Sequence, residues 1–95
     1  MPDQFDVVEV GGTFALVMGH DDLPRGRTVV VAPLIEGVPD AGRLTPTIAH
    51  DGTDYILYVM GLTTIRISDA VVTDHNAMDR RDAIVGAMDM FLTGI

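Results

Sequence analysis

The sequence contains neither cysteine nor lysine. Without cysteine the chain can form no disulfide and no thiolate metal site, which is compatible with the cytoplasmic location that we expect. Its six basic residues are all arginine, and the net charge is −8. We therefore expect no direct binding to nucleic acid, because affinity for phosphate backbones comes mainly from lysine and arginine. An acidic surface serves solubility or suits a basic protein partner.

Long hydrophobic runs are also missing. Although 47% of the residues are hydrophobic, glycine, histidine or aspartate interrupts every run before the roughly 18 residues that a membrane span requires. We therefore expect no membrane segment, and the N-terminal sequence does not resemble a signal peptide. The 95 residues predict one domain, residues 1–95, with a modest core that a dimer would help to stabilise.

The segment of residues 79–95 is the clearly helical part of the chain. Apolar residues at helical spacing predict a face that packs on a sheet: Ile84, Met88, Phe91, Leu92 and Ile95. Four other residues at the same spacing are expected on the opposite face, toward water or a partner: Asp82, Gly86, Asp89 and Thr93. Met90 lies between the faces, so it either packs on the core or borders a contact surface. Asn76 is the predicted N-cap. No stop signal is apparent, so we expect the end to insert into a partner or to fray.

The rest of the chain predicts short strands. β-branched or alternating apolar residues mark residues 4–10, 13–18, 28–35, 43–50, 53–60 and 62–68. Gly11-Gly12 and Asp51-Gly52 are typical of hairpin turns, and Pro33 predicts that its strand lies at an edge, ends or bulges there. Residues 68–76 lead into the helix. This order predicts a mainly β fold, a small antiparallel sheet or SH3-like barrel with the C-terminal helix packed on it.

The residues alone give no case for an enzyme. The sequence has no phosphate-binding glycine loop, no nucleophile elbow and no HExxH-type spacing. The three histidines are far apart in the sequence, so we expect each in a surface turn: His20, His50 and His75. Asp21-Asp22 and the pair of Asp51 and Asp54 can be read as paired carboxylates, but turns use aspartate for conformational reasons. We therefore predict no catalytic residue, no metal site and no cofactor.

Four stretches in order and spacing resemble the CcdB family of toxins. They are the C-terminal run of residues 87–95 closing on Gly-Ile, the opening strand at 4–7, the arginine-then-strand element at 26–34 and the proline-containing hairpin at 43–55. The resemblance covers essentially the whole chain. It implies an antiparallel sheet, a small side sheet, a C-terminal helix and a homodimer.

The resemblance also implies a function. The family's members are plasmid or chromosomal toxins of type II toxin–antitoxin systems and are not enzymes. They bind the A subunit of DNA gyrase, trap its cleaved complex with DNA, and are removed by a partly disordered CcdA-like antitoxin. By position, the gyrase contacts are Asp89, Leu92, Thr93, Gly94 and Ile95, with a loop contact at Leu23. From the residues alone, Leu23 is either a lid on the core or an exposed contact.

Two contact positions differ from the best-known plasmid toxin, which has Trp at the position of Thr93 and Asn at that of Asp89. Two other functions therefore stay open. One is a CcdB-like module that binds antitoxin but not gyrase. The other is a MazF-like endoribonuclease, which shares the fold. Such an enzyme needs basic residues near the RNA, for which Arg25 and Arg27 are available, and the net charge of −8 speaks against it.

Overall fold

A computed structural model describes residues 2–20, 27–36 and 42–94 of the chain. These residues form seven strands: β1 (Asp6–Val10), β2 (Thr13–His20), β3 (Thr28–Glu36), β4 (Thr47–His50), β5 (Thr53–Leu57), β6 (Thr63–Arg66) and β7 (Val71–Asn76). Four short 3-10 helices lie between or after them: η1 (Gly42–Leu44), η2 (Val59–Gly61), η3 (Ile67–Asp69) and η4 (Met78–Arg80). The α-helix α1 (Arg81–Thr93) follows η4 directly.

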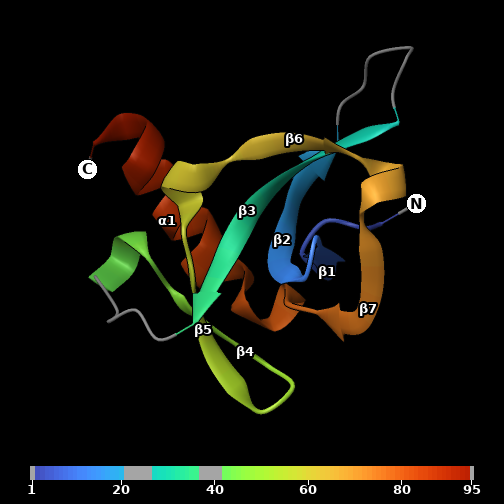
Figure 1. Cartoon of the computed structure of the whole chain (residues 1–95). Coiled ribbons are helices and arrows are strands. Elements are labelled where there is room, and N and C mark those ends of the chain that lie inside the picture. Colours follow the sequence, from blue (N-terminus) through green and yellow to red (C-terminus); the bar gives the residue numbers. More distant parts are fainter. Residues whose placement is uncertain (1, 21–26, 37–41, 95) are drawn as a thin grey trace.

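The strands form one antiparallel sheet in the order β4-β5-β3-β2-β1-β7, and β6 pairs with β3 beside this path. The sheet curls into a half-barrel, and α1 packs against it (Figure 1). The predicted fold class, a mainly β fold with a packed C-terminal helix, is therefore confirmed. In this order β4 and β7 are the two terminal strands of the sheet.

Two tight turns set the register of the hairpins. Gly11 and Gly12 connect β1 to β2 with φ angles of 57° and 85°, and Asp51 and Gly52 connect β4 to β5 with 52° and 81°. Positive φ at both central residues is the conformation that two-residue hairpins prefer, and glycine and aspartate adopt it at low cost. Both predicted hairpins are confirmed, and Asp51 has the conformational role expected of a turn residue.

Pro33 marks the point where β3 changes partners. Up to the pair of Ala15 and Pro33, β3 pairs with β2, and from the pair of Leu34 and Leu57 it pairs with β5. β3 continues to Glu36, so the alternative that it ends at Pro33 is wrong. At Pro33 itself β3 has a paired residue on one side only, Ala15 of β2, because its pairs with β6 end at Val31 and those with β5 begin at Leu34. The strand is therefore locally at an edge there, as one of the expected alternatives has it. The missing N–H of proline falls where one ladder gives way to the next.

The main core lies between the sheet and α1. It contains apolar residues from most elements: Phe5, Val7, Leu16, Ala32, Leu34, Ile48, Leu57, Val59, Ala77, Ile84 and Ala87. A second cluster, with Val8, Ala15, Val17, Val29 and Val31, lies on the other side of the same strands. Strand β2 contributes to both, which confirms the burial on both faces expected from its continuous apolar run.

The segment before the helix differs from expectation. Residues 71–76 are not a lead-in but strand β7, which pairs with β1 through Val72 opposite Val8 and Val71 opposite Glu9. Residues 42–44 form η1 instead of the start of a strand. Polar residues are depleted in strands, so pairing with β1 decides the conformation of β7 where its own sequence does not.

Asn76 does not cap α1 as predicted. Its side-chain oxygen accepts a hydrogen bond from the N–H of Met78 across 2.9 Å, at the start of η4. Its amide donates to the carbonyl of Gln4 at 3.0 Å and to the carboxylate of Asp6 at 2.9 Å. Asn76 therefore ties the end of β7 to the first described residues, and the N-cap position of α1 is Arg80, which makes no side-chain capping bond.

Candidate partner-binding site at the end of helix α1

A groove of about 460 Å³ runs along the outer face of α1. The helix lines it with residues of the predicted outward face and their neighbours: Asp82, Ala83, Gly86, Asp89, Met90 and Thr93. Arg43 of η1 and Pro46, just after it, form the opposite wall. Asp82, Gly86, Asp89 and Thr93 are all exposed, as the spacing predicts. Because Gly86 has no side chain, the helix surface stays open at the middle of the groove.

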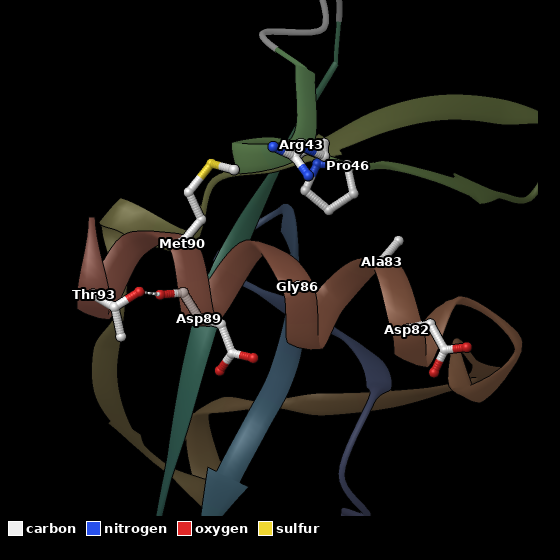
Figure 2. A pocket seen from close by; sticks show the side chains of 8 residues that line it. All are labelled: Arg43, Pro46, Asp82, Ala83, Gly86, Asp89, Met90 and Thr93. Atoms are coloured by element: carbon white, nitrogen blue, oxygen red, sulfur yellow. Dashed lines mark hydrogen bonds between the residues drawn. The ribbon is translucent and has the colours of Figure 1, made fainter. Parts of the chain in front are cut away.

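The walls of the groove differ in chemistry. Figure 2 shows Met90 and Ala83 on the side of the helix that faces Arg43 and Pro46, whereas the carboxylate of Asp89 points away from them. Met90 is half-buried, so of the two alternatives for this residue the structure favours the border of the groove over the core. The groove therefore offers an apolar strip with carboxylates on the rim formed by the helix and the guanidinium of Arg43 on the opposite wall.

The last turn of α1 extends beyond the sheet (Figure 1). Its apolar side chains are exposed. Leu92 is 69% exposed and Phe91 40%, whereas Ile84 and Ala87, nearer the start of the helix, are fully buried. The expectation that Phe91 and Leu92 pack on the core is therefore wrong. Helical spacing identifies a common face, but the core lies only beneath the first half of that face.

The end of α1 has a defined stop. Gly94 adopts the left-handed conformation with a φ of 75°, and its N–H donates to the carbonyl oxygen of Met90. This is the αL cap by which helices commonly end on glycine. The expectation that no stop signal follows the helix is therefore wrong: Gly94 itself is the signal.

Thr93 presents little of its polar group to a partner. Its hydroxyl donates to the carbonyl oxygen of Asp89 across 2.6 Å, a bond drawn as a dashed line in Figure 2. The side chain is exposed, and the bond directs the hydroxyl back along the helix, so the methyl group remains the free part. Thr93 therefore contributes a small apolar surface to the lining of the groove.

Some expected site residues lie outside the described residues. These are Leu23 and Ile95, together with Asp21, Asp22 and Arg25. The structure places Asp89, Leu92 and Thr93 on the last two turns of α1, with Gly94 as its C-cap. Of the six expected contacts it therefore groups four on one exposed surface.

A second cavity, of about 520 Å³, brings together residues that sequence reasoning kept apart. It is lined by Phe14, His50, Asp51, Thr73, Asp74 and His75. The expectation of separate histidines in surface turns is wrong for two of them: His50 ends β4 and is only 9% exposed, and His75 lies in β7. Their Nδ1 atoms are 2.9 Å apart. Nothing in the sequence indicates that these two histidines meet, because it is the curl of the sheet that brings β4 and β7 together.

The described parts of the chain offer no grouped set of metal ligands. In residues 2–20, 27–36 and 42–94, no three His, Cys, Asp or Glu side chains are placed to hold a metal ion together. In the same ranges, α1 is too short and too polar to cross a membrane.

In sequence comparisons, no family model and no curated protein matches this chain.

Proposed function

We propose that this protein is a toxin of a type II toxin–antitoxin system. In this proposal it acts in the cytoplasm as a homodimer, binds the A subunit of DNA gyrase through the end of α1, traps the cleaved gyrase–DNA complex and carries out no catalysis of its own. A CcdA-like antitoxin neutralises it. The proposal rests on the resemblance to the CcdB family and on one structural observation, the exposed apolar end of α1 beside a groove.

The exposed end of α1 supports a role in binding on energetic grounds. Leu92, at 69%, is the most exposed large hydrophobic side chain among the described residues. Fully burying a leucine side chain is worth about 1.5–3 kcal/mol. The neighbouring Phe91 adds an aromatic surface of the kind that dominates interface energies. A partner that covers this turn therefore gains from both residues without any rearrangement of the core.

The charges around the groove support a partner with basic groups. Asp82 and Asp89 line one side of the groove and are exposed. Complementary charge at the rim of an interface mainly speeds association and selects the partner. The net charge of −8 gives the same preference over a longer range.

The conformation of Thr93 favours a second candidate function, a module that binds antitoxin but not gyrase. Its hydroxyl is engaged by the carbonyl of Asp89, so threonine supplies only a methyl group where a tryptophan anchor stands in the best-known toxin of the family. Large aromatic anchors carry much of the energy of an interface. The two functions differ in one measurable property, binding to gyrase.

A tail deletion tests the proposal. We would measure binding of the full chain, and of a chain lacking Gly94 and Ile95, to the breakage–reunion domain of gyrase A from the same host by calorimetry. The proposal predicts binding by the full chain and its loss after the deletion, while circular dichroism shows an unchanged fold. A folded full chain that does not bind favours the antitoxin-binding module. A deleted chain that no longer folds makes the tail part of the core and contradicts the proposed role.

A further inference from the structure

The two ends of the curled sheet are joined by a pair of histidines. In the strand order β4 and β7 are the terminal strands, and His50 of β4 meets His75 of β7 with Nδ1 atoms 2.9 Å apart. A second bond ties the same two regions, because Arg80 Nε, in η4 just after β7, donates to the carbonyl oxygen of Thr47 in β4 across 3.1 Å. Of these two contacts, the histidine pair can change its charge near neutral pH, whereas the arginine cannot.

The two imidazole rings meet edge to edge in a common plane. Their planes differ by 2° and their centroids are 5.2 Å apart. The centroids cannot be farther apart than this, because their separation cannot exceed the 2.9 Å between the Nδ1 atoms plus the distance from each Nδ1 atom to the centroid of its own ring. The centroids and the two Nδ1 atoms therefore lie on one line, which is the geometry of a hydrogen bond in the ring plane and not of face-to-face stacking.

This geometry requires one proton between the two Nδ1 atoms. A neutral imidazole has one nitrogen that donates and one that accepts, whereas both nitrogens of an imidazolium donate. One ring therefore donates from Nδ1 and the other accepts at Nδ1. A first additional proton, taken up at an Nε2 atom, strengthens the bond by charge. A second one protonates the accepting Nδ1, which leaves two N–H groups and two positive charges facing each other.

The surroundings hold the rings in place. The ring of Phe14, from β2, lies edge-on to His50 at 4.7 Å, and the ring of Tyr55, from β5, lies 6.5 Å from His50. The backbone of His75 is held by its main-chain N–H, which donates to the hydroxyl of Thr73 at 3.2 Å, while that hydroxyl donates to the carbonyl of Val7 in β1. His50 itself is only 9% exposed.

Two carboxylates and three uncharged side chains surround the histidine pair. Asp51, from the β4–β5 turn, and Asp74, from β7, line the same cavity. Phe14, Tyr55 and Thr73, the remaining neighbours from β2, β5 and β7, are uncharged. Whatever the surroundings contribute, a second added proton must enter between two nitrogens 2.9 Å apart, where the accepting nitrogen already faces an N–H.

We propose that His50 and His75 form a pH-sensitive latch between β4 and β7. The latch is closed when the pair shares a proton and opens when both imidazoles are charged. Opening separates the β4–β5 hairpin from β7 and exposes the cavity of Phe14, His50 and His75. The latch is independent of the proposed gyrase contact, because that contact lies at the far end of α1.

The latch has a definite sign in the stability of the fold. In acid the unfolded chain binds a proton on each histidine, while the latched chain binds one fewer, so the unfolded state gains a proton relative to the native state. Once the first proton is bound, stability therefore falls as the pH falls further, and one proton of difference changes the unfolding constant by about tenfold per pH unit. The change falls within the range of about pH 5–8 in which imidazoles take up protons.

The test compares urea unfolding of the full chain from about pH 7.5 to about pH 5, the range in which histidine titrates, for the wild type, His75→Asn and His20→Asn. Asparagine places an amide near the position of Nδ1, does not titrate, and can turn its oxygen toward a charged His50. As the pH falls over this range, we expect the unfolding constant of the wild type to rise more than that of His75→Asn, by a factor of at least several-fold. The His20→Asn control, which keeps the pair, should follow the wild type.

A second readout does not depend on any variant. Nitrogen-detected NMR of the wild-type rings at neutral pH should show Nδ1 protonated in one of His50 and His75 and unprotonated in the other. Equal acid sensitivity of wild type and His75→Asn would overturn the latch. So would rings that both carry their proton on Nε2. If His75→Asn does not fold, the NMR result decides alone.

Discussion

The N–H of Gly94 donates to the carbonyl oxygen of Met90 across 2.8 Å, with Gly94 in the left-handed conformation at a φ of 75°. This bond closes the last turn of α1, which carries Leu92 and Thr93. The exposed end of the helix is therefore a fixed surface and not a fraying tail. A fixed surface loses less conformational entropy when a partner covers it.

Gly94→Ala should weaken this cap, while Gly86→Ala should stabilise the helix. The left-handed conformation costs a residue with a Cβ about 1–2 kcal/mol, so we expect Gly94→Ala to lower the free energy of unfolding by about that amount or to release the last turn. Gly86 lies in the helix interior, and a Cβ there meets nothing within 4 Å. Alanine at that position should add about 0.5–1 kcal/mol. Urea unfolding measures both changes in the free energy of unfolding. Changes of the same sign in the two variants would contradict the assignment of Gly94 as the cap.

Leu92→Ala should reduce binding to the gyrase domain without destabilising the fold. A side chain that is 69% exposed contributes little to the core, so the free energy of unfolding should stay within about 0.5 kcal/mol. A hot-spot residue costs about 2 kcal/mol or more in binding. Val71→Ala is the matched control, because Val71 is 64% exposed but lies in β7, on the far side of the sheet from the end of α1 (Figure 1). Equal effects of the two variants on calorimetric affinity would exclude Leu92 as a contact.

Thr93→Trp should strengthen gyrase binding about tenfold, since an aromatic anchor adds well over 1 kcal/mol at the centre of an interface. The position is exposed, and its hydroxyl bond to Asp89 lies within one turn of helix, so the fold should accept the larger side chain. Calorimetry of the variant beside the wild type measures the gain. An unchanged or weaker affinity would show that this face of the helix does not enter the partner.

Asp89→Asn tests the negative rim of the groove. Removing a rim charge mainly changes the association rate and its dependence on salt, so we expect slower association with a basic partner and a shallower salt dependence. Asp54→Asn, an exposed carboxylate in the β4–β5 hairpin, is the control and should change neither. Stopped-flow association at several salt concentrations measures both variants. Faster association of Asp89→Asn would mean that the partner surface is acidic.

Local chemistry made most of the fold predictable. Asp51-Gly52 and Gly11-Gly12 specify tight turns, and the β-branched run of β3 specifies a strand. β7 was missed although Val71, Val72 and Thr73 favour a strand, because Asp74 and Asn76 in its second half are of types depleted in strands and pairing with β1 holds the strand. Phe5 is a similar case: its φ of 71° has no local signal, and its burial and a 2.7 Å bond from its N–H to the carbonyl of Val17 maintain it.

The sequence predicts the orientation of those site residues that helical periodicity determines. It does not predict the exposure or the contacts that depend on how the helix and the sheet pack. The outward positions of Asp89 and Thr93 follow from helical spacing. The exposure of Phe91 and Leu92 depends on how far the sheet reaches beneath α1, which periodicity does not contain. The meeting of His50 and His75 depends on strand order and on the curl of the sheet, which relate residues 25 positions apart.

The most direct test of the proposed function is a cleavage assay with gyrase from the same host, supercoiled DNA and the purified full chain. Trapping of a cleaved complex gives linear DNA after the protein is digested, and the proposal predicts that linear DNA accumulates with the wild type and far less with Leu92→Ala. A folded, dimeric wild-type chain that neither binds gyrase A nor yields linear DNA would contradict the proposal and leave the antitoxin-binding module as the function.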